Sequence, residues 1–130
     1  MSEEDRSLAS GDWFEKASRD WQQIEERLGE SECADAAFLL QQSVEKYLKG
    51  YLVSKEWELK RTHDVADLLK EVVQYNSDFA AFTDLCGEIS EYYFLEWNPS
   101  PSKVPSKERV EEILQQAQHL VGRIVEETRQ

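Results

Sequence analysis

Two short stretches of the chain carry side chains that can hold charge or move a proton. The first spans residues 41–49 and the second spans residues 61–64. Lysine and arginine bind phosphate groups, and histidine exchanges a proton near neutral pH. We therefore predict a site for an anionic group, such as a nucleotide phosphate, formed by Lys46, Lys49, Arg61 and His63.

Helical periodicity places the first stretch on one helix. Apolar residues recur there at steps of three and four, at Ala37, Leu40, Val44 and Leu48. The same spacing puts the polar residues together on another side of the helix, at Gln42, Glu45, Lys46 and Lys49.

The second stretch is typical of a helix start. Thr62 can cap the following helix, and Asp64 and Asp67 place negative charge in its first turn. The positive end of that helix would add backbone donors to a phosphate site.

The pattern Gln41-Gln42-x-x-Glu45-Lys46-x-x-Lys49, followed by Arg61-Thr62-His63-Asp64, resembles the HEPN family (higher-eukaryote and prokaryote nucleotide-binding domains). The resemblance extends from Trp13 to about Val125, and it fits the small stand-alone prokaryotic members. It implies a helical, dimeric domain that binds nucleotides. It also implies pairing with a small nucleotidyltransferase encoded next door, in toxin–antitoxin-like modules.

Catalytic members of this family are metal-independent ribonucleases. Their motif is an arginine followed four to six residues later by a histidine, contributed by both chains of a dimer. The arginines here are at 6, 19, 27, 61, 109, 123 and 129, the histidines are at 63 and 119, and no pair has that spacing. Glu96 occupies the place where many short members carry an Arg-Tyr-Pro sequence. We therefore assign no catalytic residue and do not transfer the ribonuclease activity.

An aromatic run follows at residues 92–97. A helix buries one face against its own bundle, and consecutive aromatic residues cover more than one face. The run therefore predicts a homodimer interface, unless the proline-containing loop Asn98–Pro105 folds over it. The candidate interface residues are Tyr92, Tyr93, Phe94 and Trp97.

Simpler interpretations of the charged residues remain open. Glu45 and Lys49 are four residues apart, so a surface ion pair worth about 0.3–0.5 kcal/mol accounts for both. The lysines fit solvated positions equally well, and His63 fits a residue that hydrogen-bonds locally at the helix start.

Charge and composition limit the possible functions. The net charge of −12 argues against broad nucleic-acid binding. Residues 46–70 are the locally positive part, with 6 basic and 4 acidic side chains, net +2. Two histidines and no Cys-x-x-Cys predict no metal site, and we expect no cofactor. Cys33 and Cys86 fit free buried thiols in a reducing compartment.

No apolar run is long enough to span a bilayer, and the acidic start of the chain resembles neither a secretory signal nor a transit peptide. These features predict a cytoplasmic protein.

The sequence predicts one all-α domain over residues 1–130, an up-and-down antiparallel bundle of four to five helices. Residues 1–11 are expected to be a flexible tail, because Asp12-x-x-Glu15 resembles a capping box. Further helices are expected at about Cys33–Lys55, Val65–Tyr75 and Phe79–Tyr93, and from about Ser106 onward.

Two functional hypotheses follow. The first is a non-catalytic, dimeric HEPN-type module that binds a nucleotide, a nucleotidyltransferase partner, or both. The second is a ribonuclease toxin with a rearranged active site, and the missing Arg–His spacing favours the first.

Overall fold

The computed structural model describes the backbone of residues 3–55, 62–98 and 100–129, and the side chains of these ranges from residue 9 onward. These ranges contain five α-helices, two 3₁₀ helices and no strand, which confirms the predicted all-α helical bundle. In chain order the elements are α1 (Glu3–Gly29), α2 (Cys33–Ser54), α3 (Val65–Tyr75), η1 (Ser77–Phe82), α4 (Thr83–Ser90), η2 (Glu91–Glu96) and α5 (Lys107–Thr128).

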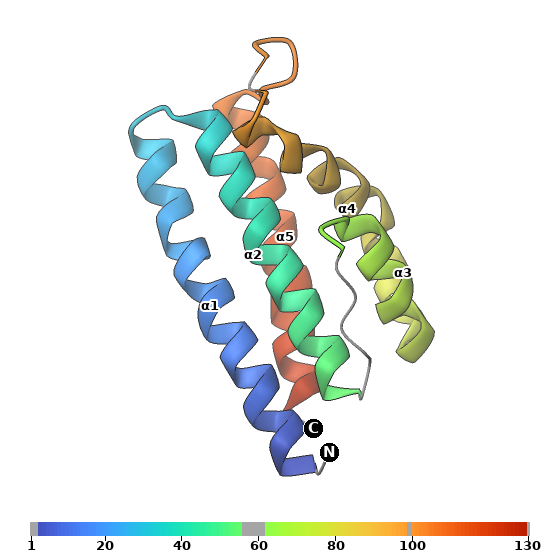
Figure 1. Cartoon of the computed structure of the whole chain (residues 1–130). Coiled ribbons are helices and arrows are strands. Elements are labelled where there is room, and N and C mark those ends of the chain that lie inside the picture. Colours follow the sequence, from blue (N-terminus) through green and yellow to red (C-terminus); the bar gives the residue numbers. More distant parts are fainter. Residues whose placement is uncertain (1–2, 56–61, 99, 130) are drawn as a thin grey trace.

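Helix α2 lies at the centre of the bundle. It packs against α1 on one side and against α3, α5 and η2 on its others. Figure 1 shows that α1 and α2 are antiparallel, whereas α5 runs in the same direction as α2. The bundle thus combines antiparallel and parallel neighbours around one helix, and residues of α2 carry the polar network described below.

The core is formed by the apolar stripes that the periodicity of the sequence predicts. Since each helix buries one face, aliphatic side chains from all five helices meet at the centre. Its largest fully buried apolar side chains are Tyr51, Phe79, Ile24, Leu40, Leu48, Leu52, Leu68, Ile89, Ile113, Leu120 and Ile124.

The predicted helix start at Asp12 is wrong, because α1 begins at Glu3. The residues before Asp12 continue along the surface of α2, where the Ser10 hydroxyl is buried and donates to the Gly50 carbonyl oxygen at 2.6 Å. Packing on α2 therefore extends the helix beyond the local capping signal.

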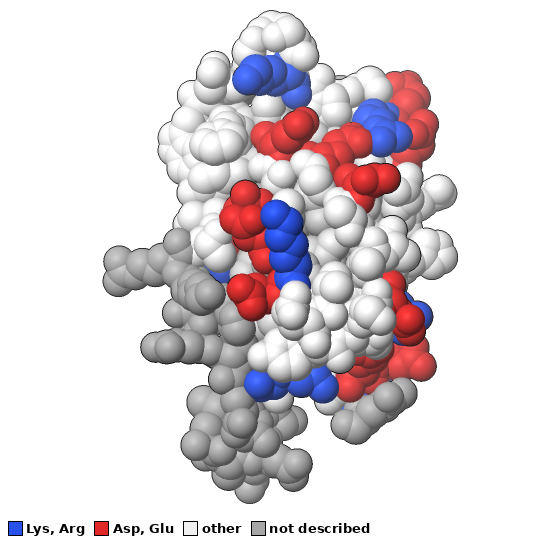
Figure 2. All heavy atoms as spheres, turned by 90° about the vertical axis from the view of Figure 1, so that its right-hand side faces the viewer, with Lys and Arg blue, Asp and Glu red and all other residues white. Residues whose placement is uncertain are grey.

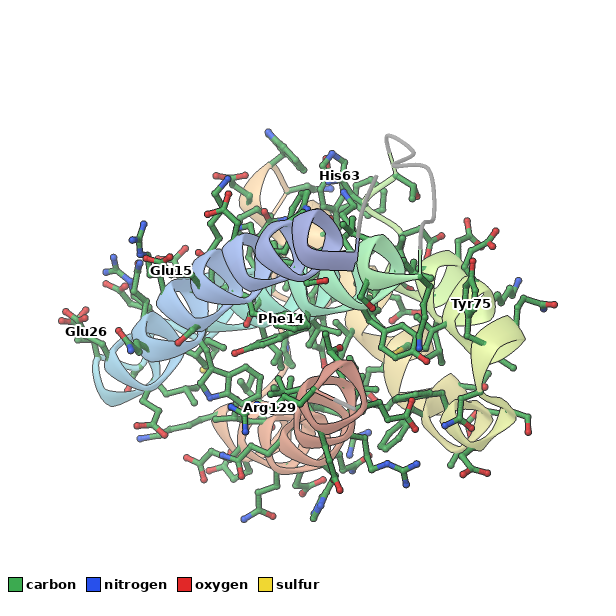
Figure 3. All side chains as sticks on the ribbon, turned by 90° about the horizontal axis from the view of Figure 1, so that it is seen from below. Phe14, Glu15, Glu26, His63, Tyr75 and Arg129 are labelled. Atoms are coloured by element: carbon green, nitrogen blue, oxygen red, sulfur yellow. The ribbon has the colours of Figure 1, made fainter. Side chains whose placement is uncertain are left out.

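Helices α1 and α2 approach each other closely. A Cβ atom on Gly50 would lie 2.6 Å from the ring of Phe14, so only glycine fits there without rearrangement. Further along the same contact, the buried Ser43 hydroxyl donates to the carbonyl oxygen of Ala17 at 2.8 Å. Figure 3 shows Phe14 among the side chains inside the bundle, with Glu26 on the outer side of α1.

The start of α3 is fixed by Asp64 and not by Thr62. The Asp64 carboxylate accepts from the backbone amides of Ala66 at 2.9 Å and Asp67 at 3.3 Å, as an N-cap residue does. Thr62 instead accepts from the Asp64 amide at 3.1 Å, which shapes the turn before the helix. The predicted helix itself, Val65–Tyr75, is confirmed.

The predicted fourth helix is broken into η1, α4 and η2. The Asn76 side chain accepts from the Asp78 amide and starts the first 3₁₀ turn. The tighter 3₁₀ winding at both ends changes the direction of successive side chains. In η2, Tyr92 and Leu95 are buried and Phe94 is exposed.

Helix α5 begins where the sequence predicts. The Ser106 side chain caps it by accepting from the Arg109 amide at 3.1 Å. Arg109 then joins α5 to α4, since its guanidinium donates to both carboxylate oxygens of Glu88.

Both cysteines are free thiols, with Cys86 buried and Cys33 partly exposed. Burial raises the pKa of the Cys86 thiol to about 12, so it stays protonated at neutral pH. In the described part of the chain, no helix is both long enough and apolar enough to cross a bilayer.

Candidate functional site

A buried carboxylate organises the polar residues of α2. Glu45 is 4 % exposed, and its side chain meets three donors. The Lys49 ammonium lies 3.2 Å from Oε2, while Gln41 Nε2 at 3.2 Å and His63 Nδ1 at 2.8 Å approach Oε1. We refer to Gln41, Glu45, Lys49 and His63 as the Glu45 network.

The geometry of the Glu45 network follows from helical spacing. Gln41, Glu45 and Lys49 are four residues apart, so they line one side of α2. Gln41 also donates to the backbone oxygen of His63 at 2.9 Å, and Gln42 donates to the Gln41 side-chain oxygen at 2.6 Å. Hydrogen bonds to Gln41 and Glu45 of α2 thereby fix the position of His63 at the start of α3.

The sequence placed the Glu45–Lys49 pair on the surface, and that interpretation is wrong. The ion pair exists, but the two side chains are only 5 % and 8 % exposed. Trp13 of α1 lies over the Lys49 ammonium, with its ring centroid 5.7 Å away, which is within range for a cation–π contact. The pair is buried because α1, which includes Trp13, packs over this part of α2.

The predicted phosphate site stays a prediction. Lys46 forms an ion pair with Asp20 of α1, and Lys49 pairs with Glu45. Arg61 lies outside the described residues. Both described lysines therefore have a carboxylate partner in the same chain, with which a bound phosphate would compete.

His63 connects the Glu45 network to an aromatic surface. A carboxylate only accepts hydrogen bonds, so the proton lies on Nδ1, facing Glu45. The imidazole stacks on Tyr93 of η2, with 4.8 Å between ring centroids and 12° between planes. About half of the His63 side chain is exposed.

Four aromatic side chains, Phe38, Tyr93, Phe94 and Trp97, form one cluster, which we call the aromatic patch. Tyr93 is its centre, with ring centroids at 4.9 Å to Trp97, 5.4 Å to Phe94 and 6.4 Å to Phe38. Phe94 and Trp97 are 64 % and 62 % exposed. The described part of the loop after η2 therefore leaves both rings open to solvent.

Tyr92, the remaining predicted interface residue, points into its own chain. It is 4 % exposed and its hydroxyl donates to Glu88 at 2.7 Å. Burial, together with this carboxylate, raises the pKa of the Tyr92 phenol. Hydrogen bonds from Arg109 lower the pKa of Glu88. Burial acts against this shift, and the hydrogen bond from Tyr92 adds to it. An interface built on this run thus relies on Tyr93, Phe94 and Trp97.

Two clefts flank Phe94. The smaller, about 370 Å³, lies between η2 and the residues that begin α3, with Asp64 and Glu91 among its lining residues. The larger, about 700 Å³, lies between η2 and the following loop, and Lys103 contributes to its lining. The sequence did not predict these clefts, because they depend on the 3₁₀ turns of η2.

The electrostatic character of the surface is mixed. On the face of the molecule that α3 and α4 present, the basic side chains are scattered, and several lie beside acidic ones (Figure 2). Among the described residues, no group of three or more His, Cys, Asp or Glu side chains is arranged to hold a metal ion.

The chain is a small helical domain in which a Gln-Gln-x-x-Glu-Lys-x-x-Lys helix binds the histidine of a following Thr-His-Asp segment. A family model described as the HEPN domain matches residues 10–128, so the chain belongs to the HEPN domain family. Among solved structures it is similar to TT1696 from Thermus thermophilus, with a TM-score of 0.72 and 26 % identity. That match covers 92 % of this chain and 97 % of the other. A comparison with curated proteins gave no match.

Proposed function

We propose that this protein is a non-catalytic HEPN-type interaction module that self-associates through its aromatic patch. The observation that carries the proposal is the exposure of Phe94 and Trp97, whose rings both contact Tyr93. Adjacent exposed aromatic side chains are costly in water and are enriched at the centres of protein interfaces.

A two-fold arrangement suits this surface. In an isologous dimer one patch meets its own copy, so a single stretch of sequence supplies both sides of the contact. A specific interface of this kind buries about 1,200–2,000 Å² in total. Tyr93 stacks on His63 and meets Trp97 edge-on, and these contacts order the surface, which lowers the entropic cost of association.

The charges around His63 support a non-catalytic role. The Nδ1 atom of His63 faces the buried carboxylate of Glu45, an arrangement that would also suit a general base, so the pairing of the nearby cation is the feature that matters. A ribonuclease with a rearranged site would need a cation close to His63 to stabilise a phosphate, and the described lysine of the network is itself paired with Glu45. A nucleotide ligand and a nucleotidyltransferase partner remain hypotheses from the family resemblance.

Sedimentation velocity of matched variants tests the proposal. Phe94→Ala and Trp97→Ala should each shift the protein toward monomer without loss of helical circular dichroism, because neither side chain belongs to the core. Tyr75→Ala is the control, since Tyr75 is also an exposed aromatic residue, at 46 %, but lies on α3 outside the patch. Equal association of all three variants and the wild type would contradict the proposal.

A further inference from the structure

The smaller cleft beside Phe94 combines two kinds of group that recognise cations. Its lining includes three rings, those of His63, Tyr93 and Phe94, and two carboxylates, those of Asp64 and Glu91. None of the described residues that line it is a lysine or an arginine. These five residues come from the start of α3 and from η2, and we call the site they form the acidic–aromatic cleft.

The aromatic side of the cleft is ordered by contacts within the protein. The imidazole of His63 and the ring of Tyr93 are nearly parallel at 4.8 Å, and Phe94 meets Tyr93 edge-on at 77°. Phe94 is largely exposed, so its ring is available to a ligand. An ammonium or guanidinium group within about 6 Å of such a ring is attracted by its π electrons.

The acidic side of the cleft is not neutralised by the described part of the chain. Asp64 and Glu91 are both exposed, and neither forms an ion pair with any residue in the described ranges. Asp64 accepts two backbone amide hydrogen bonds as the cap of α3, so the positive end of that helix offsets part of its charge. The chain as a whole carries a charge of −12, and this field attracts cations and repels anions.

We propose that the acidic–aromatic cleft binds an organic cation, an alkylammonium or guanidinium group, between the ring of Phe94 and the carboxylates of Asp64 and Glu91. The same carboxylates repel phosphate, so this site differs in sign from the phosphate site predicted at Lys46, Lys49, Arg61 and His63, with which it shares His63. A volume of about 370 Å³ fits one such side chain or small amine. The binding chemistry is the same whether the cation is a free amine or a lysine or arginine of another protein.

This inference goes beyond self-association, and the two share part of the surface. Tyr93 and Phe94 belong both to the aromatic patch and to the cleft, so a dimer formed through the patch would compete with the cation. Asp64 and Glu91 lie outside the patch, and Glu91 also lines the larger cleft. Substitutions of the two carboxylates therefore test the cleft with the patch intact.

The test is a titration of the full-length protein followed by backbone amide chemical shifts in nuclear magnetic resonance. The probes are butylammonium and 1-pentanol, which has a similar length and no charge, at constant ionic strength. We expect saturable shifts of the Asp64, Glu91 and Phe94 amides with butylammonium and not with 1-pentanol. Equal shifts with both probes, or no saturable shift with butylammonium, would overturn the proposal.

Charge-matched variants separate the site from general attraction to an acidic protein. Glu91→Gln and Asp64→Asn should each weaken butylammonium binding about two- to fivefold, as expected for one solvent-exposed ion pair. Asparagine also caps helices well, so Asp64→Asn should keep α3 intact. Glu26→Gln removes one exposed charge from the outer side of α1 and should leave binding unchanged (Figure 3). Equal weakening by all three variants would contradict a specific site.

A short lysine-containing peptide distinguishes the two sources of the cation. Binding at least tenfold tighter than butylammonium, and sensitive to Glu91→Gln, would identify a protein side chain as the ligand. Equal affinities would identify a small amine. A peptide whose binding does not respond to Glu91→Gln would contradict the proposal for a protein ligand.

Discussion

Replacing Glu45 with glutamine should destabilise the protein far more than the same replacement at Glu15. Both residues form an ion pair with a basic side chain four positions later, Lys49 and Arg19 respectively. The environments differ, because the Glu45–Lys49 side chains are 5 % and 8 % exposed and the Glu15–Arg19 side chains are 62 % and 68 % exposed. The two substitutions therefore compare a buried and an exposed ion pair with the same substitution and the same spacing.

The magnitude follows from what each substitution leaves behind. Glu45→Gln leaves the Lys49 ammonium buried without a carboxylate, and the new amide NH₂ competes with donors that already converge there. Breaking a buried ion pair costs about 3–5 kcal/mol. Because glutamine keeps the shape and one acceptor oxygen, we expect the lower end, about 3 kcal/mol. Glu15→Gln should cost about 0.5 kcal/mol or less.

Urea unfolding, followed by far-ultraviolet circular dichroism at neutral pH, measures both values. The slope of the unfolding free energy against urea should stay unchanged, so that the midpoints report stability. If Glu45→Gln cost no more than Glu15→Gln, the Glu45 network would be solvated, and the reasoning from its burial would be refuted.

Three further predictions concern packing, acid stability and activity. Gly50→Ala should lower the free energy of unfolding by about 1–2 kcal/mol in urea titrations, because its Cβ would meet Phe14. Gly122 has open space around its Cβ position, so Gly122→Ala should raise the free energy of unfolding by about 0.5–1 kcal/mol. The reverse order would contradict the close contact between α1 and α2. The pKa of Glu88 is lower in the folded protein than its ordinary value of 4.5, so Glu88 stabilises the fold above that pH and loses this contribution as the pH falls through the folded pKa. Glu88→Gln should therefore reduce the loss of unfolding free energy between neutral and acid pH. An unchanged dependence of the unfolding free energy on pH would contradict this. Purified protein should cleave RNA no faster than a buffer control, and cleavage that disappears in His63→Ala would support the ribonuclease alternative.

The sequence predicted the helices because their apolar stripes are long and periodic. Tyr51, Leu48 and Leu40 of α2 lie in the core as their spacing indicates, and α5 starts directly after Ser106, near its predicted start. The start of α1 could not be predicted, because the signal at Asp12 is local. The contact that overrides it, between Ser10 and Gly50, joins residues 40 positions apart.

The Glu45 network was predicted in part, because helical periodicity also applies to polar residues. Helical spacing placed Glu45 and Lys49 on one side of α2, and the resemblance singled out His63. Their burial depends on Trp13 and the rest of α1 lying over them, which spacing within α2 does not reveal. The exposure of the aromatic residues could not be predicted either, because the 3₁₀ turns of η2 determine that Tyr92 is buried and Phe94 is exposed.

The most direct test of the proposed function is the mass of the wild-type protein in solution. Sedimentation equilibrium at tens of micromolar should give a mass close to twice the monomer value of 15.2 kDa, decreasing toward the monomer on dilution. A single monomer mass across that range would contradict self-association through the aromatic patch.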